Sequence, residues 1–232
     1  MILYVNGDSN TAAGEAVNDY CFAEDDPKLW AFGRSPHPDN LKVSWGQRLA
    51  DRLGATLHCD AESASSNQRI TRTLDDYLLH HRPDLVVIGW STWEREEWIH
   101  DNKWYQVNAG GVGNDWPEAI KERYKQWIVN LNYQAMMNKM HRSIHNLHNR
   151  LSDMGVNHFF FTCYEPFANV EQLDWNNCYL DPYAKTSTYY NWCLNNGFKP
   201  VKEGSYHFGA DAHAAWAEFL YPQIVQSCLT KK

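Results

Sequence analysis

The first ten residues constrain the fold of this chain most strongly. Residues 1–6 are mostly apolar, β-branched or aromatic, and the run ends abruptly in Gly7-Asp8-Ser9-Asn10. A short apolar run broken by glycine is typical of a buried strand. Ligands of open α/β sheets bind beyond the carboxyl ends of the strands, so a serine hydroxyl placed there is a candidate nucleophile. The same four residues are also typical of an ordinary polar turn.

Strand-like and helix-like segments alternate along the rest of the chain. Residues 83–90 form a nearly continuous apolar run, as expected of a central parallel strand, and residues 55–60 and 157–164 are further predicted strands. The alternation predicts a single domain, residues 1–232, with a three-layer α/β architecture and five mostly parallel strands. The predicted helices cover residues 44–54, the segment up to about residue 80, residues 115–154 with a break near 130–132, residues 187–196 and a C-terminal segment after residue 209.

The run Gly7-Asp8-Ser9-Asn10, so close to the start of the chain, resembles the first block of the SGNH (GDSL-type) hydrolase superfamily. The resemblance implies a flavodoxin-like sheet and ester hydrolysis through an acyl-enzyme, with Ser9 as the nucleophile. His207 lies just before the predicted C-terminal helix, at the place of the catalytic histidine. The aromatic insertions also resemble phage-encoded members of this superfamily.

The acid that should orient His207 is missing from its usual place. The resemblance puts an aspartate three residues before the histidine, where this chain has Gly204. Glu203 is therefore the expected partner of His207; otherwise a backbone carbonyl holds the ring and the site is a Ser-His dyad. His213 matches a second, non-catalytic histidine of the superfamily, and Asp211 is expected to be a charge at the helix terminus.

The oxyanion hole also departs from the superfamily pattern. Ala64, or Ser65 if the alignment shifts by one residue, stands where the second block has glycine, and Ser91 stands where the third block has asparagine. A hydroxyl can donate a hydrogen bond but rotates more freely than an amide, and one lost donor costs about 2.7–4 kcal/mol of barrier. The expected donors are the backbone N–H groups of Ser9 and of Ala64 or Ser65, with the side chain of Asn67 or Ser91.

Four residues near the predicted site are expected to contact substrate: Asp8, Asn10, Trp90 and Arg95. Two roles are open for Arg95. Its positively charged guanidinium can donate hydrogen bonds to a developing anion or an acidic substrate, or it can form an ion pair with a nearby carboxylate.

A histidine stripe lies in the far half of the long predicted helix. His141, His145 and His148 follow the spacing His-x-x-x-His-x-x-His, which lines one helical face. Such spacing can bind a metal, but no glutamate follows the first histidine as in metalloproteases. We therefore expect a solvated or partner-facing helix surface, and the predicted reaction needs neither a metal nor an organic cofactor.

Composition excludes several classes of function. The net charge of −7 and the lack of a basic stripe argue against a nucleic-acid binder. There is neither a signal-peptide pattern nor an apolar run of membrane-spanning length, so the expected location is cytoplasmic, with association with a virion left open. The six cysteines show no C-x-x-C pair and are expected to be reduced and mostly buried: Cys21, Cys59, Cys163, Cys178, Cys193 and Cys228.

The aromatic content points to the substrate class. The chain holds 11 Trp and 13 Tyr, many of them in polar segments, and such rings often stack on sugars or fill interfaces. The expected substrate is a small acyl ester, such as an O-acetylated carbohydrate, with lipid and aryl esters as alternatives. The competing hypothesis is a catalytically impaired protein of the same fold that binds glycans or serves as a structural virion component, and homo-oligomers are left open.

Overall fold

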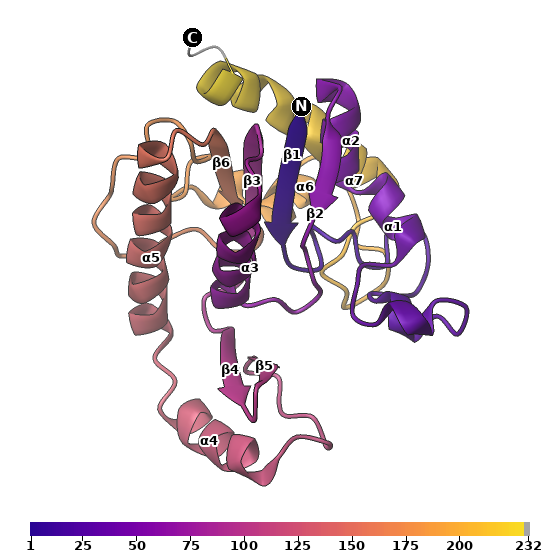
Figure 1. Cartoon of the computed structure of the whole chain (residues 1–232), viewed down its shortest axis with the longest axis vertical. Coiled ribbons are helices and arrows are strands. Elements are labelled where there is room, and N and C mark those ends of the chain that lie inside the picture. Colours follow the sequence, from indigo (N-terminus) through magenta and orange to yellow (C-terminus); the bar gives the residue numbers. More distant parts are fainter. Residues whose placement is uncertain (230–232) are drawn as a thin grey trace.

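A four-stranded parallel sheet forms the centre of the computed structural model, which describes residues 1–229 (Figure 1). The strands lie in the order β2 (Thr56–Cys59), β1 (Ile2–Gly7), β3 (Leu85–Trp90) and β6 (His158–Thr162). The first strand thus lies inside the sheet, as its continuous burial requires. This is the strand order of a flavodoxin-like sheet, and the predicted α/β class is confirmed.

The predicted number of five strands is wrong for the described sheet. Next to β6, where a fifth strand would lie, the chain forms only one isolated parallel bridge, between Phe160 and Tyr179. The Phe160 N–H donates to the Cys178 carbonyl there at 2.8 Å. Asn176 and Asn177 have φ angles of 48° and 62°. This left-handed backbone cannot continue as a strand, so the extended segment is reduced to a single pairing.

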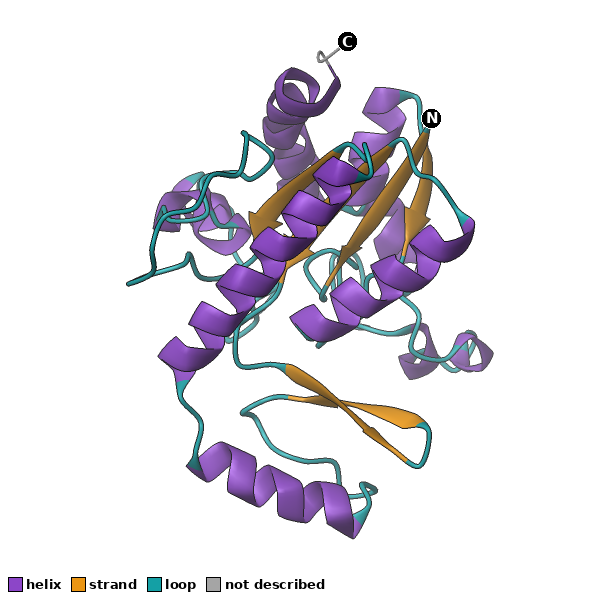
Figure 2. Cartoon of the chain, turned by 60° about the vertical axis from the view of Figure 1, so that its left-hand side comes forward, coloured by secondary structure: helices purple, strands orange, loops and turns teal. Residues whose placement is uncertain are grey.

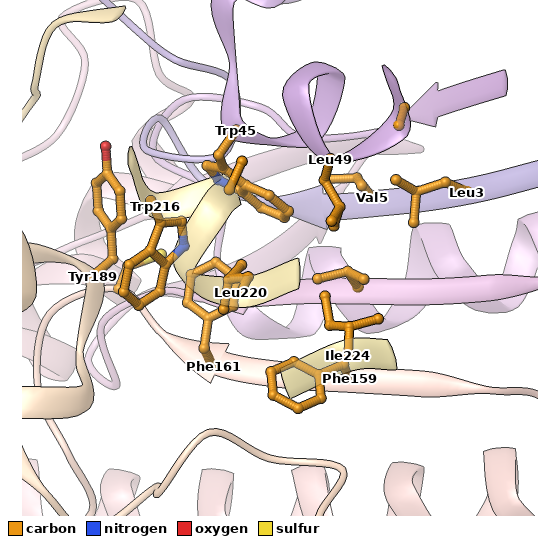
Figure 3. Packing of buried hydrophobic residues seen from close by; sticks show 14 of the residues in the cluster. Leu3, Val5, Trp45, Leu49, Phe159, Phe161, Tyr189, Trp216, Leu220 and Ile224 are labelled. Carbon is orange, nitrogen blue, oxygen red and sulfur yellow. The ribbon is translucent and has the colours of Figure 1, made fainter. Parts of the chain in front are cut away.

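One face of the sheet is covered by α2 (Trp45–Leu53), α6 (Tyr189–Asn195) and α7 (Ala210–Ile224). The Ser44 side chain accepts a hydrogen bond from the Gln47 N–H, so it caps α2 as the sequence indicates. Alternate strand residues meet these helices because successive side chains point to opposite faces. Figure 3 shows this packing, which includes Leu3, Val5, Trp45, Leu49, Phe159, Phe161, Tyr189, Trp216, Leu220 and Ile224.

The opposite face is covered by α3 (Asn67–His80) and the long α5 (Tyr133–Asp153), as Figure 2 shows. The intervening strand residues, such as Tyr4 and Val86, pack against apolar side chains of these two helices. Three layers result, as predicted. Within residues 1–229, none of the helices is both long enough and apolar enough to cross a membrane.

A hairpin and a helix project from the carboxyl end of the sheet (Figures 1 and 2). The hairpin pairs β4 (Glu96–His100) with β5 (Lys103–Val107), and α4 (Glu118–Val129) packs against it through Trp98, Val107 and Ile120. The sequence patterns did not predict this hairpin. The expected helix break near residues 130–132 is confirmed, because α4 ends at Val129 and α5 begins at Tyr133.

The remaining elements are short. The segment between β1 and α2 is an ordered loop, as expected, and holds two 3₁₀ turns and α1 (Pro38–Val43). A third 3₁₀ turn spans Lys185–Ser187, and a π-helical turn, Val225–Leu229, follows α7. Four of the six cysteines are buried and two are half-buried, which agrees with the expectation that most of them are buried.

His213 on α7 is a buried histidine that links the C-terminal helix to α2. The Trp45 N–H donates to its Nδ1 atom at 3.4 Å, and the Tyr189 hydroxyl lies 3.4 Å from its Nε2 atom. Burial, with a smaller effect of His207, lowers the pKa of His213 to about 3. An unfolded histidine has a pKa of about 6.5. Below that pH the unfolded state therefore binds a proton that the folded state cannot.

Acidification is expected to destabilise the fold through His213. The contribution of His213 to the free energy of unfolding is fully present above pH 6.5 and is lost as the pH falls toward 3. Between pH 7 and pH 5 the free energy of unfolding should therefore decrease by about 2 kcal/mol. Urea unfolding at both pH values measures this decrease. His213→Asn keeps a hydrogen-bond acceptor but has no ring that titrates. The decrease in its free energy of unfolding between pH 7 and pH 5 should therefore be about 2 kcal/mol smaller than that of wild type. An equal decrease in both proteins would exclude His213 as the cause.

Candidate active site

Ser9 lies in a tight turn that follows β1 directly. The N–H groups of Thr11 and Ala12 donate to the Asp8 carbonyl at 3.0 and 2.9 Å, which closes the turn. A Cβ atom on Gly7 would lie 2.1 Å from the Thr11 Oγ1 atom, so only glycine fits before the turn. Ser9 is 5% exposed. The turn thus presents Ser9 at the carboxyl edge of the sheet, where the sequence predicted it.

His207 contacts an acid that the sequence patterns did not identify. Its Nδ1 atom lies 2.6 Å from the Glu15 Oε2 atom. A carboxylate only accepts, so Nδ1 carries the proton and Nε2 keeps a free electron pair. Glu15 is further held by a hydrogen bond from Ser205 at 3.2 Å and by an ion pair with Lys202. Glu15 and His207 therefore have the relation of the acid and the base in a catalytic triad.

The pKa of Glu15 reflects these contacts. Partial burial opposes its ionisation, but hydrogen bonds from Lys202 and His207 outweigh burial and lower the pKa below its ordinary value. Glu15 is therefore a carboxylate at neutral pH, and it can stabilise an imidazolium on His207.

The expected partner acid, Glu203, does not occupy this position. Its side chain is exposed, and within residues 1–229 it makes no hydrogen bond to His207. Gly204, the next residue, has a φ angle of 75°, so the chain turns away between Glu203 and the histidine. The place of the missing aspartate is taken by Glu15, from the other end of the chain.

Ser9 and Glu15 belong to the same turn structure. The Gly14 N–H donates to the Ser9 carbonyl at 2.8 Å, and Glu15 follows with a φ angle of 62°. Through Glu15, the Ser9 turn thus contacts the segment that carries His207. Among the described residues no hydrogen bond joins the Ser9 hydroxyl to the His207 ring; the Ser9 side chain interacts with the Tyr164 hydroxyl instead. Catalytic hydrogen bonds often tighten only when substrate binds.

Asp8, Ser91 and Arg95 form a hydrogen-bonded network at the Ser9 turn. The Ser91 hydroxyl donates to Asp8 Oδ2 at 2.9 Å, and one Arg95 nitrogen donates to the same oxygen at 3.1 Å and to the Ser91 hydroxyl at 2.7 Å. Asp8 Oδ1 accepts from the Asn10 N–H at 3.0 Å. Asp8 is fully buried, so its predicted contact with substrate is wrong. Of the two roles considered for Arg95, the structure shows the ion pair.

Ser91 is not available as the side-chain donor of an oxyanion hole. A hydroxyl has one proton, and that of Ser91 is directed at Asp8.

Asn67 is likewise used by the fold. Its amide nitrogen donates to the carbonyls of Ser91 and Thr92 at 3.3 and 3.2 Å, and its amide oxygen accepts from the Ser91 N–H at 2.8 Å. These bonds tie the start of α3 to the end of β3. Because both amide protons are engaged, the predicted role of Asn67 as an oxyanion donor is wrong for this arrangement.

The backbone at residues 64 and 65 decides which of the two, Ala64 or Ser65, can offer its N–H group as an oxyanion donor. The Ser65 N–H donates to the Glu62 carbonyl at 3.1 Å, which removes it as an oxyanion donor. Ala64 has a φ angle of 63°, a conformation that favours glycine, which the superfamily pattern has here. Within residues 1–229 the N–H groups of Ala64 and Ser9 have no hydrogen-bond partner. They remain the two candidate backbone donors.

Two further predicted substrate contacts are buried. Trp90 is fully buried in the core and packs edge-on against Phe160, so a substrate cannot reach it and the prediction is wrong. Asn10 is 1% exposed, and neither polar atom of its amide has a partner in the described part of the chain.

The histidine stripe of α5 packs against the chain's own segment between residues 167 and 183, so the expected open surface is wrong. His141 Nε2 lies 3.1 Å from the Tyr183 hydroxyl, and His145 Nε2 lies 2.9 Å from the Asp174 carbonyl. His148 is fully buried and bonds to His158 at 2.8 Å. The periodicity identified one helical face correctly but not what covers it.

Sequence reasoning missed two residues of the site, Glu15 and Tyr164. Tyr164 follows β6 and contacts both Ser9 and Arg95. Burial and the Asp8 charge raise its pKa well above the ordinary value, so it stays a neutral hydroxyl. Tyr164 could have been found as the last residue of the predicted strand 157–164, whereas Glu15 lies in a loop without a pattern.

No protein-family model matches the chain, and no curated protein matches it in sequence. Several solved structures resemble it, three of which follow. A protein from Desulfitobacterium hafniense DCB-2, described as lipolytic and of the G-D-S-L family, is 12% identical with a TM-score of 0.42, over 96% of this chain and 98% of that one. A carbohydrate esterase, described as having divergent catalytic and non-catalytic binding functions in its active site, is 14% identical with a TM-score of 0.41, over 97% and 68%.

The third structure is a carbohydrate esterase family 2 enzyme with a carbohydrate-binding domain, from Corynascus thermopiles (Myceliophthora fergusii). It is 17% identical with a TM-score of 0.44, over 97% of this chain and 66% of that one. The chain thus spans about two thirds of the length of the two esterase chains. At 12–17% identity these likenesses concern the fold alone.

Proposed function

We propose that this chain is a serine ester hydrolase that works through an acyl-enzyme, with Ser9 as nucleophile, His207 as general base and Glu15 as the orienting acid. The contact of 2.6 Å between Glu15 and His207 Nδ1 carries the proposal. It fixes the tautomer that leaves Nε2 free to take a proton, and it ties the histidine to the turn that holds Ser9. We further propose that residues 1–232 act as one domain, of which residues 230–232 lie outside the described part.

The proposed reaction follows from this arrangement. His207 Nε2 takes the Ser9 proton while Oγ attacks the ester carbonyl, and the Glu15 carboxylate stabilises the imidazolium that forms. The same proton then passes to the leaving alcohol. Water, activated by His207, releases the acid and restores Ser9.

Stabilisation of the oxyanion differs from the superfamily pattern. The N–H groups of Ser9 and Ala64 are the proposed donors, since the side chains of Asn67 and Ser91 are engaged elsewhere. Arg95, ion-paired with Asp8 of the Ser9 turn, is proposed to supply positive charge toward the developing anion, partly balanced by Asp8. We expect slower turnover than with a third direct donor.

A carbohydrate ester is the proposed substrate class. A cavity of about 660 Å³ lies between α3 and the β4–β5 hairpin, next to the turn that holds Ala64. Neither Ser9 nor His207 lines this cavity, but one residue of its lining, Glu62, contacts the end of β1, because the Glu62 N–H donates to the Gly7 carbonyl at 3.2 Å. Charged groups and aromatic rings together suit a saccharide, which offers both hydroxyls and apolar ring faces. The lining includes Arg34, Glu62, Arg69, Arg72, Trp104 and Trp116.

Acetate release tests this function. Purified protein is expected to release acetate from acetylated oligosaccharides with a higher kcat/KM than from an aryl acetate. Trp104→Ala should raise KM for the saccharide ester only, since it removes a ring from the cavity and leaves the reacting groups intact. No acetate from either ester would contradict the proposal.

One observation favours a second function, a glycan-binding protein that has lost catalysis. Both side chains expected to hold the oxyanion, Asn67 and Ser91, are bonded within the fold. In that case the protein binds acetylated oligosaccharides in a titration, and Trp104→Ala weakens binding, but no acetate is released.

A further inference from the structure

A cysteine thiol lies beside the proposed acid and base. One potential ligand atom from each of Glu15, Cys21 and His207 lies within 4.8 Å of the other two. The fold brings Cys21 there by a turn in which the Glu15 N–H donates to the Tyr20 carbonyl at 3.0 Å. The Cys21 sulfur also lies 3.4 Å from where a Cβ atom on Gly14 would be. The thiol is thus held against the nucleophile turn.

The proposed hydrolysis does not use this thiol. Burial and the nearby Glu15 carboxylate raise the pKa of Cys21, so it is a protonated thiol near pH 7 and a poor nucleophile. A structural role would explain a buried thiol, but Cys21 is only half-buried. Its position next to a carboxylate and an imidazole requires another explanation.

The three side chains together form a donor set for a soft divalent cation. Thiolate, imidazole and carboxylate are the protein ligands of zinc, and three such ligands with one open position are typical of accessible zinc sites. The ligand atoms need move little, since zinc–ligand distances of about 2.0–2.3 Å place neighbouring ligands somewhat under 4 Å apart. Lys202 contacts the Oε1 atom of Glu15, whereas His207 contacts Oε2, so the ion pair with Lys202 can persist when Oε2 binds the metal.

We propose that Glu15, Cys21 and His207 bind a zinc-class divalent cation. Binding forms bonds from the metal to the Cys21 sulfur, a Glu15 oxygen and His207 Nδ1; the Cys21 thiol proton passes to solvent, and the Nδ1 proton moves to Nε2, so the ring stays neutral. A second consequence rests on the proposed function: the cation switches off hydrolysis, because it takes the carboxylate that orients His207 and a nitrogen of the ring itself. Chelation of the metal restores the triad.

Cobalt(II) binding tests the site without reference to activity. Titration of the full chain with cobalt(II) is expected to give a sulfur-to-metal charge-transfer band that saturates at one equivalent, and zinc(II) should displace it. Cys21→Ala should lose the band and bind zinc at least about 100-fold more weakly, a larger effect than the loss of an outer-shell contact. Cys59→Ala, which removes another half-buried thiol, is the matched control and should behave as wild type.

Activity measured in parallel separates the two proposals. With a chelator present, wild type and Cys21→Ala are expected to hydrolyse ester equally, and zinc should inhibit only wild type. No band in wild type, or an equal band in Cys21→Ala, would overturn the metal site whatever the activity. A Cys21-dependent band in a protein without esterase activity would retain the metal site and contradict only the hydrolase.

Discussion

Ser9→Ala is expected to lower kcat for ester hydrolysis by at least about 10⁴-fold, because the substitution removes the hydroxyl that forms the proposed acyl-enzyme. The substitution removes one atom from a residue that is 5% exposed, so the fold should persist. Initial rates with an aryl acetate, under saturating conditions, measure the loss.

The control for Ser9→Ala is Ser143→Ala, at an exposed position in the middle of α5. Both variants should unfold at the same temperature as wild type, and Ser143→Ala should also have the kcat of wild type. If Ser9→Ala were folded and as active as Ser143→Ala, Ser9 could not be the nucleophile.

Glu15→Gln is expected to lower kcat by about 10³- to 10⁴-fold. The amide keeps the size of the side chain but loses the charge, and its NH₂ group can donate to Nδ1 and so select the wrong tautomer of His207. The ring nitrogen chemical shifts of His207 check the cause, because the neutral ring should carry its proton on Nδ1 in wild type and on Nε2 in Glu15→Gln.

Glu203→Gln is the matched control, since it makes the same chemical change at the acid that the sequence pattern favoured. It should keep the wild-type kcat, because Glu203 is exposed and makes no bond to His207 within the described residues. The reverse result, an active Glu15→Gln and an inactive Glu203→Gln, would reassign the acid.

Local patterns were sufficient to predict the layers of the fold. The signals for the strand that ends at Gly7 and for the apolar run of β3 come from residues adjacent in sequence, and both strands occur as predicted. The same holds for α2, whose serine cap and terminal Gly54 are sequence signals. The hairpin was missed because β4 and β5 are short and rich in charge, although Asp101 and Asn102, with φ angles of 47° and 58°, suit its two-residue turn.

The partners of the site residues could not be predicted in the same way. The bond between Glu15 and His207 joins positions 192 residues apart, and the bond between Ser91 and Asp8 joins positions 83 apart. No periodicity encodes such a contact. The predicted roles of Asn67, Ser91 and Trp90 were wrong for a related reason: the chemical type was suitable, but the fold uses or buries the group.

Covalent labelling of Ser9 tests the central claim most directly. A fluorophosphonate probe forms a stable bond only with a serine that a neighbouring base activates, and peptide mass spectrometry locates the bond. We expect one label per chain, on Ser9, together with its loss in His207→Ala. Unlabelled Ser9 in folded protein, or equal labelling in His207→Ala, would contradict the account.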